Sequence, residues 1–556
     1  MSALEGVTPF PQEYIARYRE LGYWENRSMA HFFDDICTRF AQRIALVSGD
    51  EHITYSQIAA RAERLALHLF DLGVRPRDRF VMQLPDIPEF FYVYLALQKI
   101  GAIPIMALPP HRATEINHFV KLSEAVGYAV PERFGNFEFS VLAESVRREQ
   151  ESLRWILLAG QLSLPHAIAI ADLLQKESQL PRERLAEIEI DPQLPALFLL
   201  SGGTTGVPKL IPRTHEDYIY NTRAAAAIND IRPDDALLVV LPVSHNFPLA
   251  CPGVQGFLMH GARCVLSTST QPRDVFALIE RERITHLELV PTLLIRLIHD
   301  PALKDYDLSS VRIINSGGQK LQAEVKRRTE EQLPGCKVQE VFGMAEGLLC
   351  YVRLDDSDEL RYETVGRPVS AGDELRLVDD EGHDVPEGEI GELLVRGPYT
   401  LRGYYRAPEH NARTFTPDGF YRTGDLLRRH PSGNYIVEGR KKDLINRGGE
   451  KISAEEIENL ILAHPAVLNV ACVPMPDPIL GERVCAFVIP QPGQSLTLAD
   501  LKSFLLDKHI AKFKMPERLE LMDDFPMSKF GKVSKFDLVQ RISKKLAEEQ
   551  GAKGGA

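Results

Sequence analysis

The sequence has few cysteines, and none of them stands in a pair at the spacing of a metal or redox site. The seven cysteines are scattered through 556 residues, are odd in number and form no C-x-x-C motif. Such a set argues against a disulfide framework and against a zinc site. Free thiols are typical of proteins that stay in a reducing compartment, so we expect a cytoplasmic protein.

Long apolar runs and long basic runs are also missing. No apolar stretch approaches the roughly 20 residues that a membrane-spanning helix needs. The first segment, MSALEGVTPFPQEYIARYRE, contains acids and lacks the apolar core of a signal peptide. The net charge is −12, which argues against nucleic acid as the main partner. We therefore expect no membrane partner and no nucleic-acid partner.

Short apolar runs alternate with amphipathic stretches over most of the chain. Its length predicts roughly two to four structural units. The pattern predicts strands at 79–85, 102–108, 236–243, 285–291 and 311–318, and helices at 88–101, 273–284 and 322–332. This alternation indicates an α/β fold with parallel sheets covered by helices. Ligands of such sheets bind in loops beyond the carboxyl ends of the strands.

The character of the chain changes twice in its last third. From about residue 372, frequent turn signals and short alternating runs predict a β-rich subdomain. The segment GRKKDLINRGGEK (439–451) follows, and then helices at 454–463 and 499–508 with strands at 467–474 and 483–489. We expect a large N-terminal domain over 1–442 and a small α+β C-terminal domain over 443–556, with a disordered tail at 547–556.

A loop rich in glycine and threonine, SGGTTGVPK, is the clearest candidate for a phosphate site. Glycines let backbone N–H groups turn toward an anion, and hydroxyls and a lysine add donors and positive charge. The loop is not the usual P-loop, because no glycine precedes the lysine and no Ser or Thr follows it. Taken alone, it is equally compatible with a plain turn. The expected phosphate-binding residues are Ser201, Gly202, Gly203, Thr204, Thr205, Gly206 and Lys209.

This loop resembles the signature loop of the adenylate-forming superfamily, which includes acyl-CoA ligases, luciferases and the adenylation domains of peptide synthetases. Four further motifs resemble that superfamily in the right order: VFGMAEG (341–347), YRTGDL (421–426), GRKKDLINRGGEK and FPMSKFGKVSK (525–535). The resemblance covers nearly the whole chain. It implies a two-step reaction that uses ATP and Mg²⁺, in which a carboxylate becomes an acyl-adenylate and a thiol then displaces AMP.

The resemblance also implies roles for residues around the nucleotide. Glu346 matches the magnesium-side carboxylate, since a hard cation needs oxygen ligands, and it is expected to be catalytic. Phe342 matches the residue that stacks on adenine. Asp425 matches the carboxylate that accepts the ribose hydroxyls, and Arg440 a second ribose contact. The remaining expected ATP contacts are Gly318, Gln319, Val341 and Gly343.

The C-terminal motifs resemble a catalytic lysine and a hinge. Lys532 matches the lysine that bridges the carboxylate oxygen and the α-phosphate during adenylation. Asp443 matches the hinge, where a residue must absorb a backbone change as the small domain swings. The second orientation is expected to bring Arg447, Gly448 and Gly449 toward a pantetheine tunnel.

The stretch LPVSHNFPLACPG (241–253) resembles the branch that activates aryl acids for siderophore synthesis, the 2,3-dihydroxybenzoate and salicylate AMP ligases. Asn246 matches the residue that hydrogen-bonds the 2-hydroxyl, and such a buried amide rejects acids that lack the hydroxyl. Cys251 and Leu349 stand where dihydroxybenzoate members carry Ser and Val, which disfavours a 3-hydroxyl and favours salicylate. The expected acid-binding residues are His245, Asn246, Phe247, Cys251, Gly317, Val341 and Leu349.

The acceptor of the acyl group is expected to be the phosphopantetheine thiol of a separate aryl carrier protein, because the sequence contains no phosphopantetheine attachment motif of its own. Coenzyme A presents the same thiol and remains the alternative acceptor. A 2,3-dihydroxybenzoate ligase, a related acid such as 3-hydroxypicolinate and an inactive nucleotide-binding scaffold are the other interpretations that the sequence leaves open.

Overall fold

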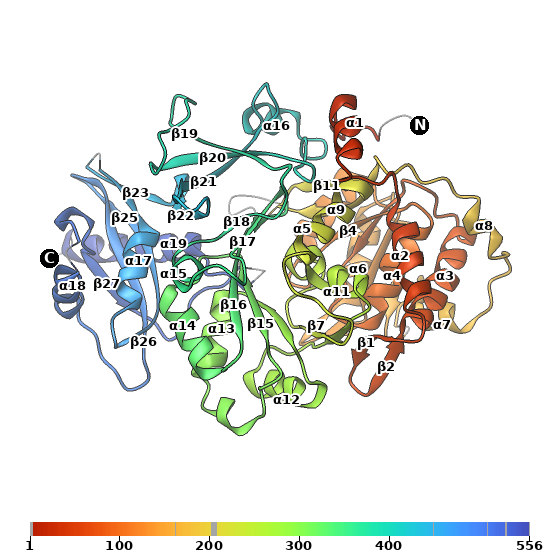
Figure 1. Cartoon of the computed structure of the whole chain (residues 1–556), viewed down its shortest axis with the longest axis horizontal. Coiled ribbons are helices and arrows are strands. Elements are labelled where there is room, and N and C mark those ends of the chain that lie inside the picture. Colours follow the sequence, from red (N-terminus) through yellow and green to blue (C-terminus); the bar gives the residue numbers. More distant parts are fainter. Residues whose placement is uncertain are drawn as a thin grey trace.

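A computed structural model describes residues 4–161, 163–201, 208–448, 450–508, 510–528 and 531–554 (Figure 1). These residues form two large sheets, a four-stranded sheet, a five-stranded C-terminal sheet and a small hairpin of β6 (Arg133–Phe134) and β7 (Phe137–Glu138). In this part of the chain no helix is both long and apolar enough to cross a membrane.

The larger sheet has nine strands and a parallel centre. In spatial order the strands are β18 (Arg367–Pro368), β17 (Gly347–Tyr351), β16 (Lys337–Met344), β15 (Ile313–Gly317), β14 (His286–Leu289), β12 (Ala236–Val239), β13 (Arg263–Leu266), β1 (Ile44–Ser48) and β2 (Glu51–Thr54). Strands β12 and β14 are buried along their whole length, as parallel strands covered on both faces usually are. Only the outer pairs β1–β2, β16–β17 and β17–β18 are antiparallel.

The second large sheet has seven strands and is parallel except at one edge. The strands are β11 (Leu210–Thr214), β10 (Pro195–Leu200), β4 (Ile103–Met106), β3 (Arg79–Met82), β5 (Gly127–Pro131), β8 (Trp155–Ala159) and β9 (Ala167–Ala169). The antiparallel edge is the pair β10–β11. The candidate phosphate loop connects these two strands, so it leaves the sheet at the carboxyl end of β10.

The helices of the N-terminal part cover and join these sheets. They are α1 (Gln12–Glu20), α2 (Met29–Arg39), α3 (Tyr55–Asp71), α4 (Pro88–Lys99), α5 (Ala113–Ser123), α6 (Phe139–Glu149), α7 (Ile170–Gln175), α8 (Glu183–Ala186), α9 (His215–Ala226), α10 (Asn246–Ala250), α11 (Gly253–Met259), α12 (Pro272–Glu282), α13 (Pro291–His299), η1 (Pro301–Asp305), α14 (Ala323–Gln332), α15 (Asp358–Glu363) and α16 (Pro408–Thr414). Helix α9 begins with a capping box in which the side chains of Thr214 and Asp217 each accept the other's backbone N–H. This box fixes where the buried helix starts.

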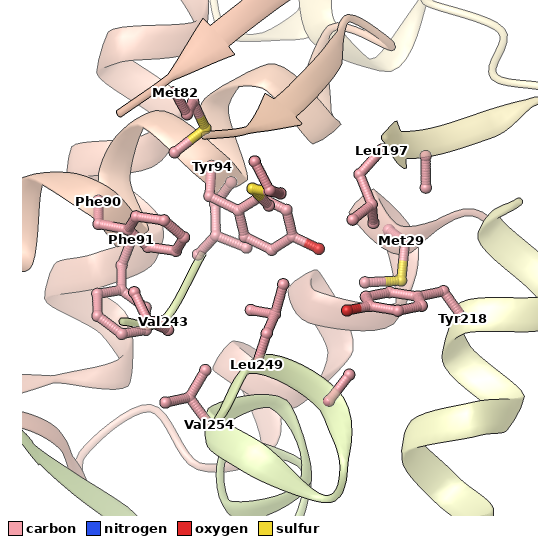
Figure 2. Close-up of a cluster of buried hydrophobic side chains, with 14 of the residues drawn as sticks. Met29, Met82, Phe90, Phe91, Tyr94, Leu197, Tyr218, Val243, Leu249 and Val254 are labelled. Atoms are coloured by element: carbon pink, nitrogen blue, oxygen red, sulfur yellow. The ribbon is translucent and has the colours of Figure 1, made fainter. Parts of the chain in front are cut away.

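A cluster of buried side chains joins helices α2, α4, α9, α10 and α11 to the second sheet. Figure 2 shows Met82, Tyr94, Tyr218 and Leu249 meeting in it from four different elements. All four are almost completely buried. Close packing in such a cluster holds α9 and α10 in fixed positions relative to each other, and α10 carries residues of the candidate site.

Among the described residues, a four-stranded antiparallel sheet and a mostly antiparallel five-stranded sheet follow. The first contains β19 (Glu374–Val378), β20 (Gly391–Arg396), β21 (Tyr421–Arg429) and β22 (Tyr435–Arg440). After the short turn η2 (Lys441–Asp443), the C-terminal sheet contains β23 (Leu444–Arg447), β24 (Glu450–Ser453), β25 (Val467–Asp477), β26 (Gly481–Pro490) and β27 (Arg518–Leu521), with α17 (Ala454–Leu462), α18 (Leu498–Asp507), η3 (Lys512–Lys514) and α19 (Lys535–Gly554) around it. Its one parallel pair is β26–β27. Figure 1 shows this sheet at one end of the molecule, with α3 and α8 at the other.

Most elements predicted from the pattern are present, and their bounds differ by a few residues. The α/β class with parallel sheets and the β-rich segment after residue 372 are both confirmed. Helix α19 continues through Gly554, and the disorder expected for 547–556 stays a prediction. The tail contains Ala, Glu, Gln and Lys, which favour helix and extend one that is already nucleated. The domain boundary at Asp443 falls in η2 and stays a prediction.

Candidate active site

The two ends of the candidate phosphate loop are tied together. Ser201 donates its backbone N–H to the carbonyl of Lys209 (3.0 Å), and the Ser201 hydroxyl accepts the Lys209 N–H (2.9 Å). The Lys209 ammonium lies 5.9 Å from the centre of the Tyr404 ring. The other expected phosphate ligands, Gly202, Gly203, Thr204, Thr205 and Gly206, lie outside the described residues. The structure therefore fixes the base of the loop beside Tyr404.

Glu346 lies in the turn between β16 and β17 and is buried. Its Oε1 accepts the hydroxyl of Tyr404 (2.8 Å), and its backbone carbonyl accepts the N–H of Leu401 (2.8 Å). Burial raises the pKa of the Glu346 carboxyl, and the Tyr404 hydrogen bond acts in the opposite direction. Sequence reasoning missed Tyr404, because one tyrosine in the segment LRGYYR carries no local signal of a distant partner.

Asp425 and Arg440 face each other across β21 and β22. They are directly paired in the register of the two strands, and Arg440 Nε donates to Asp425 Oδ1 at 2.7 Å. Asp425 is buried. The negative charge of Asp425 raises the pKa of Arg440 above its already high value. The sequence predicted both residues for the ribose, and the fold brings them together.

Lys532 reaches into the site from the C-terminal part of the chain. Its Cε atom lies 2.7 Å from the place where a Cβ atom on Gly318 would stand. The hydroxyl of Thr292 on α13 donates to the carbonyl of Gly531 (2.9 Å), so the preceding residue is attached to the N-terminal part. The described C-terminal residues are therefore in the orientation that brings this lysine to the loop after β15.

The electrostatic surroundings of Lys532 combine several predicted residues. Burial lowers the pKa of its ammonium to about 8, and the charge of Arg440 acts in the same direction. The carboxylates of Asp425 and Glu346 oppose this shift. On the other side, burial and the charge of Lys532 hold the pKa of His245 well below its usual range. These five residues thus interact electrostatically at one place, although they come from distant parts of the sequence.

Gly317 and Gly318 end β15 and shape the loop that follows it. Gly318 has a φ of +93°, which favours glycine, and Gln319 follows it half-buried. A Cβ atom on Gly317 would lie 3.1 Å from the carbonyl oxygen of Val341 and 3.4 Å from Cζ of Phe247. The absence of a side chain on Gly317 therefore keeps a narrow space between β16 and α10, as expected for a flat ring slot.

Asn246 and Cys251 lie at the two ends of α10 and are both buried. The Asn246 amide donates from Nδ2 to the Cys251 sulfur at 3.2 Å, and its Oδ1 accepts the hydroxyl of Tyr218 at 3.0 Å. His245 caps α10, since its Nδ1 accepts the N–H of Phe247 (3.2 Å). The four apolar residues predicted for the acid belong to one buried cluster: Phe247, Cys251, Val341 and Leu349.

Strands β16 and β17 set the spacing of the other predicted contacts. Leu349 is paired with Gly343, and a Cβ atom on Gly343 would lie 2.6 Å from Leu349 Cδ2. Phe342, predicted to stack on adenine, is half-buried next to Gly343 and is paired with Cys350. Gly343 therefore gives Leu349 the room to lie flat against this hairpin.

The hinge and tunnel residues follow Arg440 in the chain, and the negative charge of Asp443 helps to raise the pKa of Arg440. Asp443 is half-buried in η2, and its negative charge acts on the ion pair of Lys535 with Glu458, whose atoms are 2.7 Å apart. Arg447 pairs with Glu517 (2.7 Å) within the C-terminal part. Gly448 donates its N–H to the carbonyl of Leu480 (2.7 Å), and Gly449 lies outside the described residues. In this orientation Lys532 lies against Gly318.

The donor set at Glu346 fits a magnesium ion that is bound together with a nucleotide. Within the described ranges no three His, Cys, Asp or Glu side chains are grouped as a metal site. Magnesium is usually held by one or two carboxylates together with substrate phosphates. Glu346 offers such a buried carboxylate, and one of its oxygens already accepts Tyr404. When bound, the ion would neutralise phosphate charge there.

Two family models match the chain. The model described as AMP-binding enzyme matches residues 33–405, and the model described as AMP-binding enzyme C-terminal domain matches residues 456–532. The matched residues contain Lys209, Glu346 and Lys532. The matches agree with a large nucleotide-binding part followed by a small C-terminal part.

Three curated relatives are similar over nearly the whole chain. The 2,3-dihydroxybenzoate-AMP ligase of Bacillus subtilis is 45% identical over 98% of this chain and 99% of its own length. The salicylyl-CoA synthase / salicylate adenylyltransferase of a Streptomyces species is 46% identical over 96% of both chains. The salicyl-AMP ligase / salicyl-S-ArCP synthetase of Mycobacterium tuberculosis is 41% identical over 97% of this chain and 95% of its own. These relatives act on hydroxylated aryl acids, and they differ in the acid and the acceptor that their names give.

The grouped residues around Lys532 and the two family matches lead to the same assignment. The chain belongs to the AMP-binding enzymes of the adenylate-forming superfamily.

Proposed function

We propose that this enzyme activates salicylate with ATP, forms salicyl-AMP and pyrophosphate, and then transfers the salicyl group to the phosphopantetheine thiol of an aryl carrier protein in siderophore-type biosynthesis. The observation that carries the proposal is the buried contact of Asn246 Nδ2 with Cys251 Sγ at 3.2 Å. This amide lies beside the apolar residues expected to surround an aromatic ring, so the slot offers one polar group at its edge.

The polarity of the slot favours salicylate over 2,3-dihydroxybenzoate. A salicylate ring needs one polar partner for its 2-hydroxyl, and Asn246 is that partner. Cys251 is a weak hydrogen-bond donor that behaves as a small apolar residue. Leu349 is buried and one methylene larger than valine. Both residues therefore suit a ring edge without a 3-hydroxyl. Discrimination by a methylene is worth about 1–3 kcal/mol, so dihydroxybenzoate is expected to be a slow substrate.

The grouped charges suit the first reaction. A carboxylate oxygen of the acid attacks the α-phosphorus of ATP, and the bond to the pyrophosphate leaving group breaks. Lys532 would lie between the acid and the α-phosphate and stabilise the negative charge that develops there. Asp425 would accept the ribose hydroxyls while Arg440 holds its carboxylate in place. Positioning of this kind supplies most of the catalysis in phosphoryl transfer.

The second reaction needs a different arrangement of the C-terminal part. The thiol sulfur attacks the carbonyl carbon of the adenylate, the bond to AMP breaks and the thiol loses its proton. We propose that rotation about Asp443 removes Lys532 and brings Arg447 and Gly448 to the pantetheine path. The relative whose name includes an S-ArCP product supports the carrier protein. The relative named for a CoA product supports coenzyme A as the alternative.

ATP–pyrophosphate exchange with salicylate, 2,3-dihydroxybenzoate and benzoate tests the first step. We expect the largest kcat/KM with salicylate and no useful exchange with benzoate. A preference for dihydroxybenzoate would keep the aryl-acid assignment and overturn the choice of acid. The acceptor is tested by loading a phosphopantetheinylated aryl carrier protein in competition with coenzyme A. Faster thioester formation on coenzyme A would overturn the carrier assignment.

A further inference from the structure

Helix α9 packs against α10, which carries part of the acid slot, the space proposed to hold the acid among Asn246, Phe247, Cys251, Val341 and Leu349. Tyr218, Asn221 and Thr222 lie on one side of this helix, as residues three and four apart do. Asn221 Nδ2 donates to the carbonyl of Ala250 (2.7 Å) and lies 3.8 Å from the Cys251 sulfur. These contacts hold the C-terminal end of α10. On the same side of α9, Thr222 donates to Gln255 Oε1 (3.1 Å), and Tyr218 reaches Asn246, the residue proposed to recognise the acid.

Tyr218 is fixed in one position. Its side chain is completely buried, and the Arg213 guanidinium lies 4.9 Å from the centre of its ring. Figure 2 shows the ring extending from its helix beside Met29, with the hydroxyl directed toward the middle of the buried cluster. Burial raises the pKa of the Tyr218 phenol well above its usual value, so the hydroxyl keeps its proton. Tyr218 is therefore a permanent donor at a fixed place.

The Tyr218 hydrogen bond determines which way the Asn246 amide faces. A carboxamide has a donor side and an acceptor side, and a half-turn exchanges them. Tyr218 donates to Oδ1 at 3.0 Å, which directs Nδ2 to the Cys251 sulfur. A phenol is a much stronger donor than a thiol. The arrangement with the carbonyl at Tyr218 and the amino group at Cys251 is therefore the better of the two.

We infer that Tyr218 is a positioning residue that makes the acid slot present a hydrogen-bond donor, and that this selects acids with an ortho oxygen over acids with an ortho amino group. The inference rests on the proposed function. In an ortho-hydroxy acid the hydroxyl hydrogen bonds to the neighbouring carboxylate, and the oxygen keeps lone pairs that accept from Asn246. The bond of Asn246 to the Cys251 sulfur is weak, so a better acceptor displaces it at low cost.

An ortho-amino acid presents the opposite chemistry to the same amide. Its nitrogen lone pair is delocalised into the ring, and its N–H bonds face outward as donors. Two donors then meet, and both remain without an acceptor in a buried place, which is costly. Without the Tyr218 hydroxyl the amide is free to turn. Its carbonyl then faces the slot and accepts an amino N–H, so the discrimination should weaken.

The test compares salicylate, anthranilate and benzoate in ATP–pyrophosphate exchange with the full chain and its Tyr218→Phe variant. We expect kcat/KM for salicylate to fall about tenfold or more in the variant, and anthranilate to change by less than about threefold or to improve. The ratio of the two kcat/KM values is decisive, because a partly unfolded preparation lowers both equally. An unchanged ratio would overturn the inference.

Tyr94→Phe is the matched control. Tyr94 lies in the same buried cluster (Figure 2), and its hydroxyl accepts from Gln255 Nε2 (2.9 Å) rather than contacting Asn246. Its removal should leave the acid ratio unchanged. In an Asn246→Ala background, Tyr218→Phe should also have no further effect on the ratio, since the group that it positions is gone. A further fall in that background would contradict positioning through Asn246.

The same measurements separate this inference from the proposed function. If the wild-type enzyme uses benzoate as well as salicylate, ortho recognition is absent and both are overturned. If it prefers salicylate while Tyr218→Phe keeps the wild-type ratio, only the role of Tyr218 is overturned.

Discussion

The Cε atom of Lys532 lies 2.7 Å from the position that a Cβ atom on Gly318 would occupy, and Nζ lies 3.3 Å from it. A carbon at the first distance collides with the lysine stem. Glycine at position 318 therefore allows the lysine to take this position, and an added side chain would force the end of the lysine to shift. This contact joins the two parts of the chain at the point where the acid and the α-phosphate are proposed to meet.

Gly318→Ala should selectively impair adenylation. The methyl group collides with Lys532, so we expect the rate of ATP–pyrophosphate exchange to fall about tenfold or more, as misplacement of a catalytic group does. The substitution should have little further effect in a Lys532→Ala background, where the collision is absent. Additive losses in the double variant would contradict the steric explanation.

Gly335→Ala controls for backbone strain in that experiment. Gly335 has a φ of +92°, close to the +93° of Gly318, and an added Cβ atom there meets nothing within 4 Å. It should therefore introduce a similar backbone strain and leave the exchange rate per folded molecule unchanged.

The pKa of Lys532 predicts an alkaline limit for adenylation. The pKa is lowered to about 8, mainly by burial, so the ammonium is charged below that pH and loses its proton above it. The charged form is the one proposed to stabilise the transition state. Since kcat/KM reports the free enzyme, it should fall about tenfold per pH unit well above pH 8.

Lys532→Arg is the control, because arginine stays charged throughout this range. The ratio of the wild-type kcat/KM to that of Lys532→Arg should decline from pH 7 to 9. Parallel profiles would contradict the assignment.

Tyr404→Phe should weaken the proposed magnesium site. The hydroxyl of Tyr404 donates to Glu346 Oε1 at 2.8 Å, and a hydrogen bond to a charged group is worth about 1.5–3 kcal/mol. Its loss leaves the buried carboxylate less well oriented, so the Mg²⁺ concentration for half-maximal exchange should rise about 5- to 20-fold.

Tyr421→Phe is the control, because it removes a hydroxyl 3.0 Å from that of Tyr404 and leaves the bond between Tyr404 and Glu346. Equal magnesium requirements in both variants would exclude a specific role for Tyr404.

The sequence predicted the α/β class and many of the elements, because parallel strands buried on both faces leave continuous apolar runs such as those of β4 and β12. It predicted Asp425 and Arg440 as separate motif residues, but only the register of β21 and β22 makes them an ion pair. The sequence did not reveal Tyr404 as the partner of Glu346 or Tyr218 as the partner of Asn246. The two residues of these pairs are 58 and 28 positions apart in the sequence. A contact of that kind leaves no local pattern in one sequence.

The end of the chain shows a second limit of local patterns. Its polar, glycine-containing composition predicts disorder, whereas the residues before Gly551 favour helix, and the preceding turns of α19 are held by the buried Leu538 and Ile542. Once these apolar residues pack, helix propagation costs little for each added residue. Tertiary packing therefore decides where this helix ends, and such packing cannot be inferred from amino-acid composition.

Asp86→Asn should change how stability depends on pH. Burial raises the pKa of Asp86 to about 8 from an ordinary 3.8, while Oδ1 accepts the N–H of Val243 at 2.8 Å. Between these values the folded chain keeps a proton that the unfolded chain releases, so the wild-type protein loses stability as pH rises from about 4 to 8. Asparagine retains an acceptor for Val243 and does not titrate. The variant should thus gain stability relative to wild type progressively from pH 4 to pH 8, by at most about 1.4 kcal/mol for each pH unit.

The measurement is the difference in Tm between variant and wild type at several pH values and one heating rate. Asp355→Asn, which replaces an exposed aspartate, is the control and should show no such trend. A constant difference for Asp86→Asn across pH 5–8 would mean that the Asp86 carboxyl is ionised in the folded protein.

The pair Cys251→Ser and Leu349→Val should move acid preference toward 2,3-dihydroxybenzoate. Both residues are buried in the cluster that holds Phe247 and Val341. Serine adds a stronger donor at one side of the slot, and valine removes a methylene at the other. Together they should raise the dihydroxybenzoate-to-salicylate ratio of kcat/KM by about 10- to 100-fold, within the range expected for one methylene plus one hydrogen bond. Each single change should account for part of the shift, since both act on the same ring edge.

Cys350→Ser is a suitable control, because Cys350 is equally buried but belongs to the other large cluster. If the double variant keeps the wild-type ratio, the third ring carbon lies elsewhere, and the orientation proposed for salicylate between Asn246 and Leu349 is wrong.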